Sequence, residues 1–132
     1  MKVGVFDSGV GGLTVVKSLL EHQLFEEIIY FGDTARVPWG TRSKETIEKF
    51  SLQCAYFLAG KGVKCIVVAC NTSSSNALSK LKQEINFPIF DVVHSSIDAL
   101  ETVKGIKKVG VIGTSATISS HIHKKLIRGK YK

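Results

Sequence analysis

Short apolar runs alternate with segments of helical periodicity along this 132-residue chain, and this alternation constrains the fold more than any other feature. Each run is nearly continuously apolar, which is typical of strands buried on both faces of a parallel sheet. Successive β-α units favour an α/β fold in which right-handed crossovers place helices on both faces of such a sheet. We therefore expect a three-layer αβα parallel sheet. Its strands are expected at residues 3–6, 28–31, 66–69, 88–93 and 109–112.

The segments between the runs carry the spacing and the end signals of amphipathic helices. Ser43 is a suitable N-cap for the second helix, and Gly60 or Gly62 is suited to end it. Asn86 precedes Phe87-Pro88 and is expected to end the third helix. The last expected helix carries Ile118, Ile122 and Leu126 on its apolar face.

The charge distribution gives little support for nucleic-acid binding. The chain holds 18 basic and 11 acidic residues, a net charge of +7. Five of the basic residues lie among residues 124–132, and the chain has no strip of aromatic and basic residues of the kind that grips single strands. We interpret the basic C-terminus as a solvated tail, and we expect no nucleic-acid partner.

Composition favours a cytoplasmic protein without a metal site. Apolar residues make up 44% of the chain, but no apolar stretch approaches the ~20 residues that span a bilayer. The N-terminus runs directly into a strand and lacks the architecture of a signal peptide. Three cysteines without CxxC spacing argue against a disulfide framework and a zinc site. His94, His121 and His123 form no metal-ligating set, so we expect no metal. Because no apolar stretch is long enough to span a bilayer, we also expect no membrane partner.

Small and polar residues follow each expected strand. The carboxyl ends of parallel strands share one edge of the sheet, and ligands bind beyond that edge. We therefore expect the active edge where these residues gather. They are Asp7-Ser8, Gly32-Asp33, Cys70-Asn71-Thr72, His94-Ser95 and Gly113-Thr114.

The run Asp7-Ser8-Gly9-Val10-Gly11-Gly12 joins the first strand to the first helix. Its glycines let a ligand approach the backbone, and a helix N-terminus favours an anionic group. The run matches neither nucleotide-binding fingerprint, and the carboxylate of Asp7 would repel a phosphate. A small zwitterion fits the loop better. A tight β-α turn without a ligand is an equally weighted alternative.

Cys70 lies where the third strand ends and a helix begins, a position suited to a reactive thiol. Backbone N–H groups and the helix dipole are expected to stabilise its thiolate and lower its pKa, which makes the sulfur a base or a nucleophile. The alternative, a buried sulfur that acts as a small hydrophobe, is the commoner fate of a lone cysteine. That alternative fits Cys54, on the apolar face of its helix, and Cys65, at the far end of its strand. It fits Cys70 poorly.

The connection Gly32-Asp33-Thr34-Ala35-Arg36-Val37-Pro38-Trp39-Gly40 is longer than the fold requires. Long ordered loops at an active edge are commonly functional. We expect Trp39-Gly40 to wall a pocket and to offer a backbone contact. The alternative is a turn in which Trp39 is partly buried.

Three of these motifs resemble those of the bacterial glutamate racemases, within the aspartate/glutamate racemase family. Gly113-Thr114-Ser115-Ala116-Thr117-Ile118 resembles a fourth family segment, and the similarity runs from residue 2 to about residue 120. The three motifs lie at β-α junctions in the order seen in the family. They are Val5-Phe6-Asp7-Ser8-Gly9-Val10-Gly11-Gly12, Gly32-Asp33-Thr34-Ala35-Arg36-Val37-Pro38-Trp39-Gly40 and Ala69-Cys70-Asn71-Thr72.

The resemblance implies an isomerase that interconverts L- and D-glutamate without a cofactor, for peptidoglycan synthesis, cell-wall biogenesis and cell shape. It implies two cysteines on opposite sides of the substrate α-carbon, where a thiolate removes one proton and a thiol returns another. Cys70 matches the first cysteine, and Asp7 matches the carboxylate that assists proton transfer. Residues matching substrate-binding positions are Asp7, Ser8, Trp39, Gly40, Asn71 and Thr72, with Asp33, Thr114 and Thr117 as further candidates.

The chain departs from the family pattern in some residues. Trp39 stands where tyrosine is usual, which removes a hydroxyl, and Ser73 stands where alanine is usual. The second cysteine of the family lies in a Gly-Cys-Thr-His motif, and no such motif occurs in this sequence.

The family has two α/β lobes with the site between them. We expect residues 1–94 to form the first lobe and residues 95–132 a truncated start of the second. Asp7, Asp33 and Cys70 then all belong to the first lobe. The resemblance also implies a homodimer for a full-length protein.

Three functions stay open on this basis. The chain is part of a glutamate racemase and supplies only the first thiol. Alternatively, it is a catalytically inactive remnant or a fragment that binds a small ligand. A third option is an aspartate racemase.

Overall fold

The computed structural model describes residues 1–131, whose four strands form one parallel sheet in the order β2-β1-β3-β4. The central strands are β1 (Lys2–Asp7) and β3 (Cys65–Val68), and β2 (Glu27–Gly32) and β4 (Ile89–Asp91) lie at the edges. Phe6 of β1 pairs with Phe31 on one side and with Val68 on the other. The prediction of a parallel sheet is confirmed.

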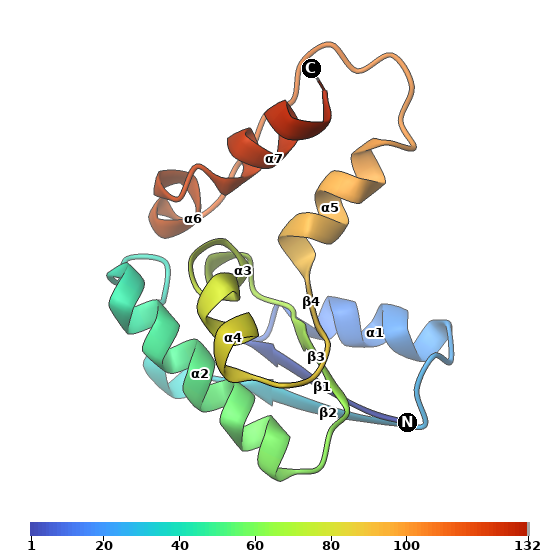
Figure 1. Ribbon diagram of the computed structural model, residues 1–132, viewed down its shortest axis with the longest axis vertical. Helices are drawn as coiled ribbons and strands as arrows, with labels where there is room; N and C mark the ends of the chain where they lie inside the picture. The colour runs from blue at the N-terminus through green and yellow to red at the C-terminus, as the bar shows by residue number, and fades with distance from the viewer. Residues whose placement is uncertain (132) are drawn as a thin grey trace.

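Helices cover both faces of this sheet, which confirms the three-layer arrangement (Figure 1). The helices α2 (Lys44–Gly60) and α4 (Leu78–Glu84) pack on one face, where Phe6 contributes to the larger core cluster. The helix α1 (Leu13–Glu21) packs on the other face, against a smaller cluster that includes Val5. Neighbouring residues of β1 enter different clusters because side chains alternate along a strand.

The ends of α2 follow the local sequence signals. The side chain of Ser43 accepts a hydrogen bond from the Thr46 N–H at 3.3 Å, which caps the helix. The helix ends at Gly60, and Gly62 adopts a left-handed φ of 77°. Both predictions for this helix are confirmed.

The fourth strand is shorter than the predicted run at residues 88–93. It stops at Asp91 because the carboxylate of that residue caps α5 (Val92–Leu100), accepting hydrogen bonds from the N–H groups of Val93 and His94 at 3.0 and 2.9 Å. The expected boundary between two lobes, after residue 94, lies within this helix.

The strand predicted at residues 109–112 is wrong for the described part of the chain. The segment pairs with no strand, because the sheet ends at β4, and the Ile112 side chain is 99% exposed. The last predicted helix is also divided, into α6 (Ser115–Ser119) and α7 (Ile122–Lys130). The break lies at His121, whose left-handed φ of 55° does not continue a helix.

Four of the five basic C-terminal residues, Lys124, Lys125, Arg128 and Lys130, lie in α7 rather than in an irregular tail, and Lys132 lies outside the described residues. None of the residues of α7 is buried, so the expected solvation is confirmed. Lys130 forms ion pairs with Asp98 and Glu101, which connects α7 to the α5 side (Figure 1). Across residues 1–131, no helix is long and apolar enough to cross a membrane.

Candidate functional site

The carboxyl ends of β1, β2 and β3 bring the predicted residues to one edge. The Asp33 N–H donates to the Asp7 carbonyl at 2.9 Å, and the Ala69 N–H donates to the Phe6 carbonyl at 2.9 Å. These backbone bonds extend the parallel pairing just beyond the strands. They place Asp7 and Asp33 at one edge of the sheet, together with Cys70, which directly follows Ala69. The strand pattern predicted this arrangement.

Asp7 organises the glycine-rich loop that follows β1. Its two carboxylate oxygens accept hydrogen bonds from the N–H groups of Ser8 and Gly12, each at 2.8 Å, and the residue is 7% exposed. A Cβ atom on Gly12 would lie 2.8 Å from the Asp7 Cβ, so close packing alone requires glycine there. The loop is thus a tight turn that also holds a buried negative charge.

Cys70 caps the short helix α3 (Asn71–Asn76) through its sulfur. The Ser73 N–H donates to Sγ at 3.4 Å, and the thiol donates to the Ser8 hydroxyl oxygen at 3.4 Å. The Cys70 residue is 4% exposed. The sulfur therefore bridges the β1 loop and the start of α3.

The predicted lowering of the Cys70 pKa is wrong for this chain. Burial raises the pKa of the thiol above its ordinary value, hydrogen bonding with Ser8 and with the Ser73 N–H lowers it, and the negative charge of Asp7 raises it further. Burial outweighs the bonds because the site is nearly closed to water. A raised pKa favours the neutral thiol and makes the thiolate, once formed, a stronger base.

Tyr30 is a neighbour that sequence reasoning missed. Its hydroxyl donates to the Gly9 carbonyl at 3.0 Å, which ties β2 to the glycine-rich loop. Burial raises the pKa of Tyr30, and the charge of Asp7 and that of the Cys70 thiolate, when present, raise it further. The sequence signal for this residue was the hydroxyl-bearing Tyr30 within the apolar run of β2.

Thr72 and Thr114 meet although 42 positions separate them. Their hydroxyl oxygens are 2.9 Å apart, so α3 and α6 are joined at the edge of the site. The Thr114 hydroxyl also caps α6 and donates to Thr117, which is 2% exposed. Thr114 therefore contacts Thr72 directly, whereas the buried Thr117 contacts only the Thr114 hydroxyl in this group. Asn71 is exposed at the first position of α3.

The prediction that the Trp39 side chain walls a pocket is wrong. Trp39 is 1% exposed and packs in the core beside Phe50, with ring centroids 5.5 Å apart. Its partners are apolar, so the large ring gains more from burial than from the loop surface. Gly40 lies at the edge, where a Cβ would be 2.4 Å from the Thr114 Cβ. Any ligand contact at this position is thus left to the backbone.

Asp33 forms an ion pair with Arg36. It is 6% exposed, and the Arg36 Nε donates to its carboxylate at 2.6 Å. The Arg36 guanidinium lies 4.0 Å from the centroid of the Phe50 ring. Asp33 thus fixes the loop after β2.

The remaining cysteines are core residues. Cys54 is fully buried, and burial raises the pKa of its thiol to about 12. Cys65 is 3% exposed, and burial raises its pKa as well. Within residues 1–131, histidine, cysteine and carboxylate side chains form no cluster able to hold a metal.

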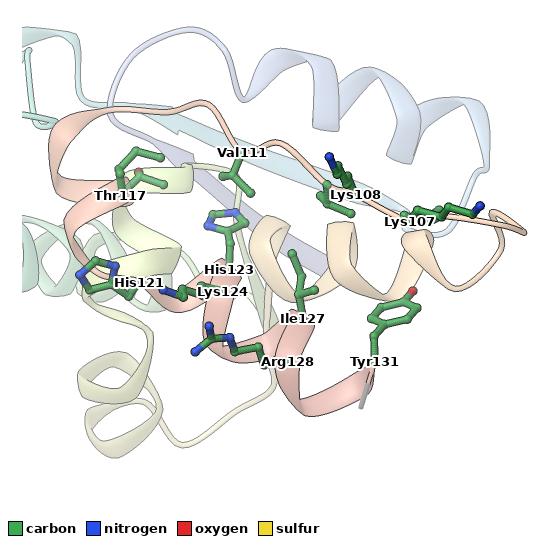
Figure 2. Close-up of a pocket in the computed structure, with 13 residues that line it drawn as sticks. Lys107, Lys108, Val111, Thr117, His121, His123, Lys124, Ile127, Arg128 and Tyr131 are labelled. Atoms are coloured by element: carbon green, nitrogen blue, oxygen red, sulfur yellow. The ribbon is translucent and has the colours of Figure 1, made fainter.

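A separate groove lies between α7 and residues 106–111 (Figure 2). It has a volume of about 520 Å³, with Val111 and Ile127 among its apolar residues and Lys108, Lys124 and Arg128 among its basic ones. Asp7, Ser8 and Cys70 do not line it. The groove is therefore distinct from the edge that carries the thiol.

The fold and the edge define a class of protein. It is an α/β protein whose parallel sheet presents a buried thiol, a carboxylate and hydroxyl groups at its carboxyl edge. Residues 12–131 match the family model described as Asp/Glu/Hydantoin racemase. The chain belongs to this racemase family.

Individual relatives agree with the family match. The chain is 54% identical over 126 residues to the glutamate racemase of Aquifex pyrophilus, covering 95% of this chain and 49% of the relative. It is 48% identical over 128 residues to the glutamate racemase of Aquifex aeolicus, covering 97% and 50%. The chain thus spans about half the length of the curated relatives it matches.

Solved structures show the same relationship. The glutamate racemase structure from Aquifex pyrophilus aligns with a TM-score of 0.95 and 50% identity, covering 99% of this chain and 52% of that chain. The Francisella tularensis enzyme in complex with D-glutamate aligns with a TM-score of 0.89 and 44% identity, covering 98% and 49%. The resemblance drawn from the motifs is confirmed, and the fold is that of the corresponding half of these enzymes.

Proposed function

We propose that this chain forms the first lobe and the start of the second lobe of a cofactor-independent glutamate racemase, with Cys70 as one of two acid–base thiols. The observation that carries the proposal is the position of the Cys70 sulfur. It is buried at the carboxyl edge of the sheet, 3.4 Å from the Ser8 hydroxyl oxygen. The negative charge of Asp7 raises the pKa of this thiol. The relatives named glutamate racemase support glutamate as the substrate.

The proposed chemistry is proton transfer at the substrate α-carbon. In one direction a thiolate on the opposite face takes the α-proton, and the neutral Cys70 thiol donates a proton to the other face. In the reverse direction the Cys70 thiolate takes the α-proton, and the opposite thiol donates one. The raised pKa of Cys70 keeps the thiol protonated for the donating step and makes its thiolate, once formed, a stronger base for the weakly acidic α-hydrogen. Asp7 strengthens that base through its negative charge.

The polar groups around Cys70 are proposed to hold the amino acid. The hydroxyls of Ser8, Thr72 and Thr114 and the side chain of Asn71 surround the edge where the sulfur lies. The backbone of Trp39-Gly40 offers a contact beside Thr114. These groups can bind the ammonium and carboxylates of a small zwitterion while the sulfur faces the α-carbon.

A fusion protein tests this assignment. Residues 1–132 are joined to the C-terminal half of the Aquifex pyrophilus glutamate racemase, which supplies the other part of the fold. We expect the fusion to racemise glutamate and the Cys70→Ser fusion to lose this activity. Cys65→Ala is the matched control, because Cys65 is a buried thiol at the entry end of the same strand.

The outcomes separate the open functions. A folded fusion that is inactive on glutamate and active on aspartate would favour the aspartate racemase. Activity that survives Cys70→Ser would remove Cys70 from the mechanism. For residues 1–132 alone we expect neither racemisation nor α-hydrogen exchange at enzyme-like rates. Clear exchange that disappears in Cys70→Ser would exclude the inactive remnant.

A further inference from the structure

A second polar cavity lies between the 40–44 loop, α3 and α6. Its volume is about 520 Å³, within the range of about 300–1,000 Å³ typical of small-molecule sites. We name it the α6 cavity, and its lining includes Arg42, Lys44, Ser75, Ser115 and Ser119. Cys70, Asp7 and Ser8 are not among its lining residues.

The charge of the α6 cavity is positive and is not balanced within it. Arg42 and Lys44 line the cavity, and its lining contains no aspartate or glutamate. The Arg42 Nε donates to the Pro38 carbonyl at 3.3 Å, which anchors the side chain and leaves the other guanidinium nitrogens to solvent. Lys44 reaches Glu48 only at 3.9 Å, in an i,i+4 pair in which the Lys44 side chain is exposed and Glu48 is half-buried. Such a partly exposed pair contributes little and yields easily to a stronger anion.

The exposed hydroxyls of Ser115 and Ser119 supply further donors at the same place. The Ser75 Oγ is buried and has no hydrogen-bond partner among residues 1–131. Ser115 and Ser119 lie one turn apart on α6 and are exposed. A fork-shaped guanidinium, an ammonium and several hydroxyls together match the many acceptor oxygens of a phosphate group.

We propose that the α6 cavity binds a small phosphate-bearing anion, for which inorganic pyrophosphate is the simplest probe. This cavity borders the proposed amino-acid site at Gly40, but Cys70, Asp7 and Ser8 do not line it, and anion binding there does not depend on their chemistry. A nucleotide base has no platform there, because no aromatic side chain lines the cavity. The ligand class is therefore a phosphate or diphosphate group, free or on a small polar molecule.

Occupancy would stabilise the contact between α3, α6 and the 40–44 loop. The Ala116 N–H donates to the Gly40 carbonyl at 3.0 Å, and the Asn76 amide donates to the carbonyls of Thr72 and Ala116. An anion held by Arg42 and by hydroxyls of α6 would bridge the same elements. Binding to the folded state would then raise the Tm of the chain.

Calorimetry and NMR on the full chain test the proposal. Pyrophosphate and phosphate are titrated at constant ionic strength, with chloride and glutamate as comparison anions. We expect saturable binding, tighter for pyrophosphate than for phosphate, with amide shifts concentrated at residues 40–44, 75–76 and 115–120. Arg42→Gln should weaken pyrophosphate binding by about tenfold or more.

Two charge-matched controls define the site. Lys49→Gln removes an exposed charge from α2 outside the cavity, and Arg128→Gln removes one from the α7 groove. Both should bind pyrophosphate as the parent chain does. Ser119→Ala, on an exposed position, gives a second variant that should also weaken binding.

Four results would overturn the proposal. They are equal shifts with chloride, equal binding of glutamate in the cavity, unchanged affinity in both Arg42→Gln and Ser119→Ala, and loss of affinity in Arg128→Gln as large as that in Arg42→Gln.

Discussion

Two buried serine hydroxyls hydrogen-bond to each other, and removal of one of them should lower the free energy of unfolding more than removal of both. Ser51 on α2 and Ser73 on α3 are both fully buried, and their oxygens are 2.7 Å apart. Neither hydroxyl has another side-chain hydrogen bond among the described residues. Each hydroxyl is therefore satisfied by the other.

The magnitude follows from burial. Ser73→Ala leaves the Ser51 hydroxyl without a partner, which costs about 1–3 kcal/mol in the free energy of unfolding. Ser51→Ala leaves the Ser73 hydroxyl in the same condition, with a similar cost. The double variant has no orphaned hydroxyl, so it should lose about 1 kcal/mol or less relative to the parent chain. The two single losses sum to about 2–6 kcal/mol, so we expect a coupling energy of at least about 1 kcal/mol.

Urea unfolding followed by fluorescence measures all four proteins. Trp39 is the one tryptophan in the sequence and is buried, so its emission reports loss of the core. The m-values should be equal, which shows that the folded states have similar compactness. Single variants within about 0.3 kcal/mol of the parent, or losses that simply add in the double variant, would refute the reasoning.

Three further predictions concern other parts of the chain. Because burial raises the Cys70 pKa above its ordinary value of 9.0, its alkylation by iodoacetamide should increase with pH and reach half its maximum above pH 9. Mass spectrometry of the labelled peptide measures this, and a midpoint below pH 8 would contradict it. Gly32→Ala should destabilise the chain by about 1–3 kcal/mol, because the new Cβ would lie 2.3 Å from the Gly9 carbonyl oxygen. Gly60→Ala, with no atom within 4 Å, is the control and should be neutral or slightly stabilising in thermal unfolding. The apolar side chains exposed near α7, including Ile112, should cause self-association of the isolated chain in sedimentation velocity. A monomer with a sharp, concentration-independent unfolding transition would count against that prediction.

Local and periodic features of the sequence were enough for the sheet and for the location of the site. Apolar runs predicted β1 to β4, and the carboxyl-edge rule predicted that Asp7 and Cys70 lie at the same edge of the sheet. The cap at Ser43 was readable for the same reason, since capping depends on a few adjacent residues.

Features that depend on distant partners were not readable. Thr72 and Thr114 meet through tertiary packing, and no periodic pattern records such a contact. The segment at residues 109–112 has the composition of a strand, but within residues 1–131 no strand pairs with it. Its pattern describes a preference, whereas a strand requires a partner.

The direction of the Cys70 pKa shift was also not predictable from the sequence. A helix N-terminus predicts a lowered thiol pKa, but α3 is only six residues long and the sulfur is almost completely buried. The balance between helix dipole and desolvation is set by burial, which the motif does not contain. For Trp39, likewise, loop position suggested a pocket wall, and only the packing around Phe50 shows that its ring belongs to the core.

The central claim is that Cys70 serves one face of the substrate α-carbon, and single-face hydrogen exchange tests it most directly. In the fusion with the Aquifex pyrophilus C-terminal half, the cysteine of that half is replaced by serine, leaving Cys70 as the acid–base thiol. In deuterated water, proton NMR follows loss of the α-hydrogen from L- and D-glutamate separately. We predict exchange of one enantiomer only, abolished by Cys70→Ser. Equal exchange of both enantiomers, or exchange that persists in Cys70→Ser, would contradict the account.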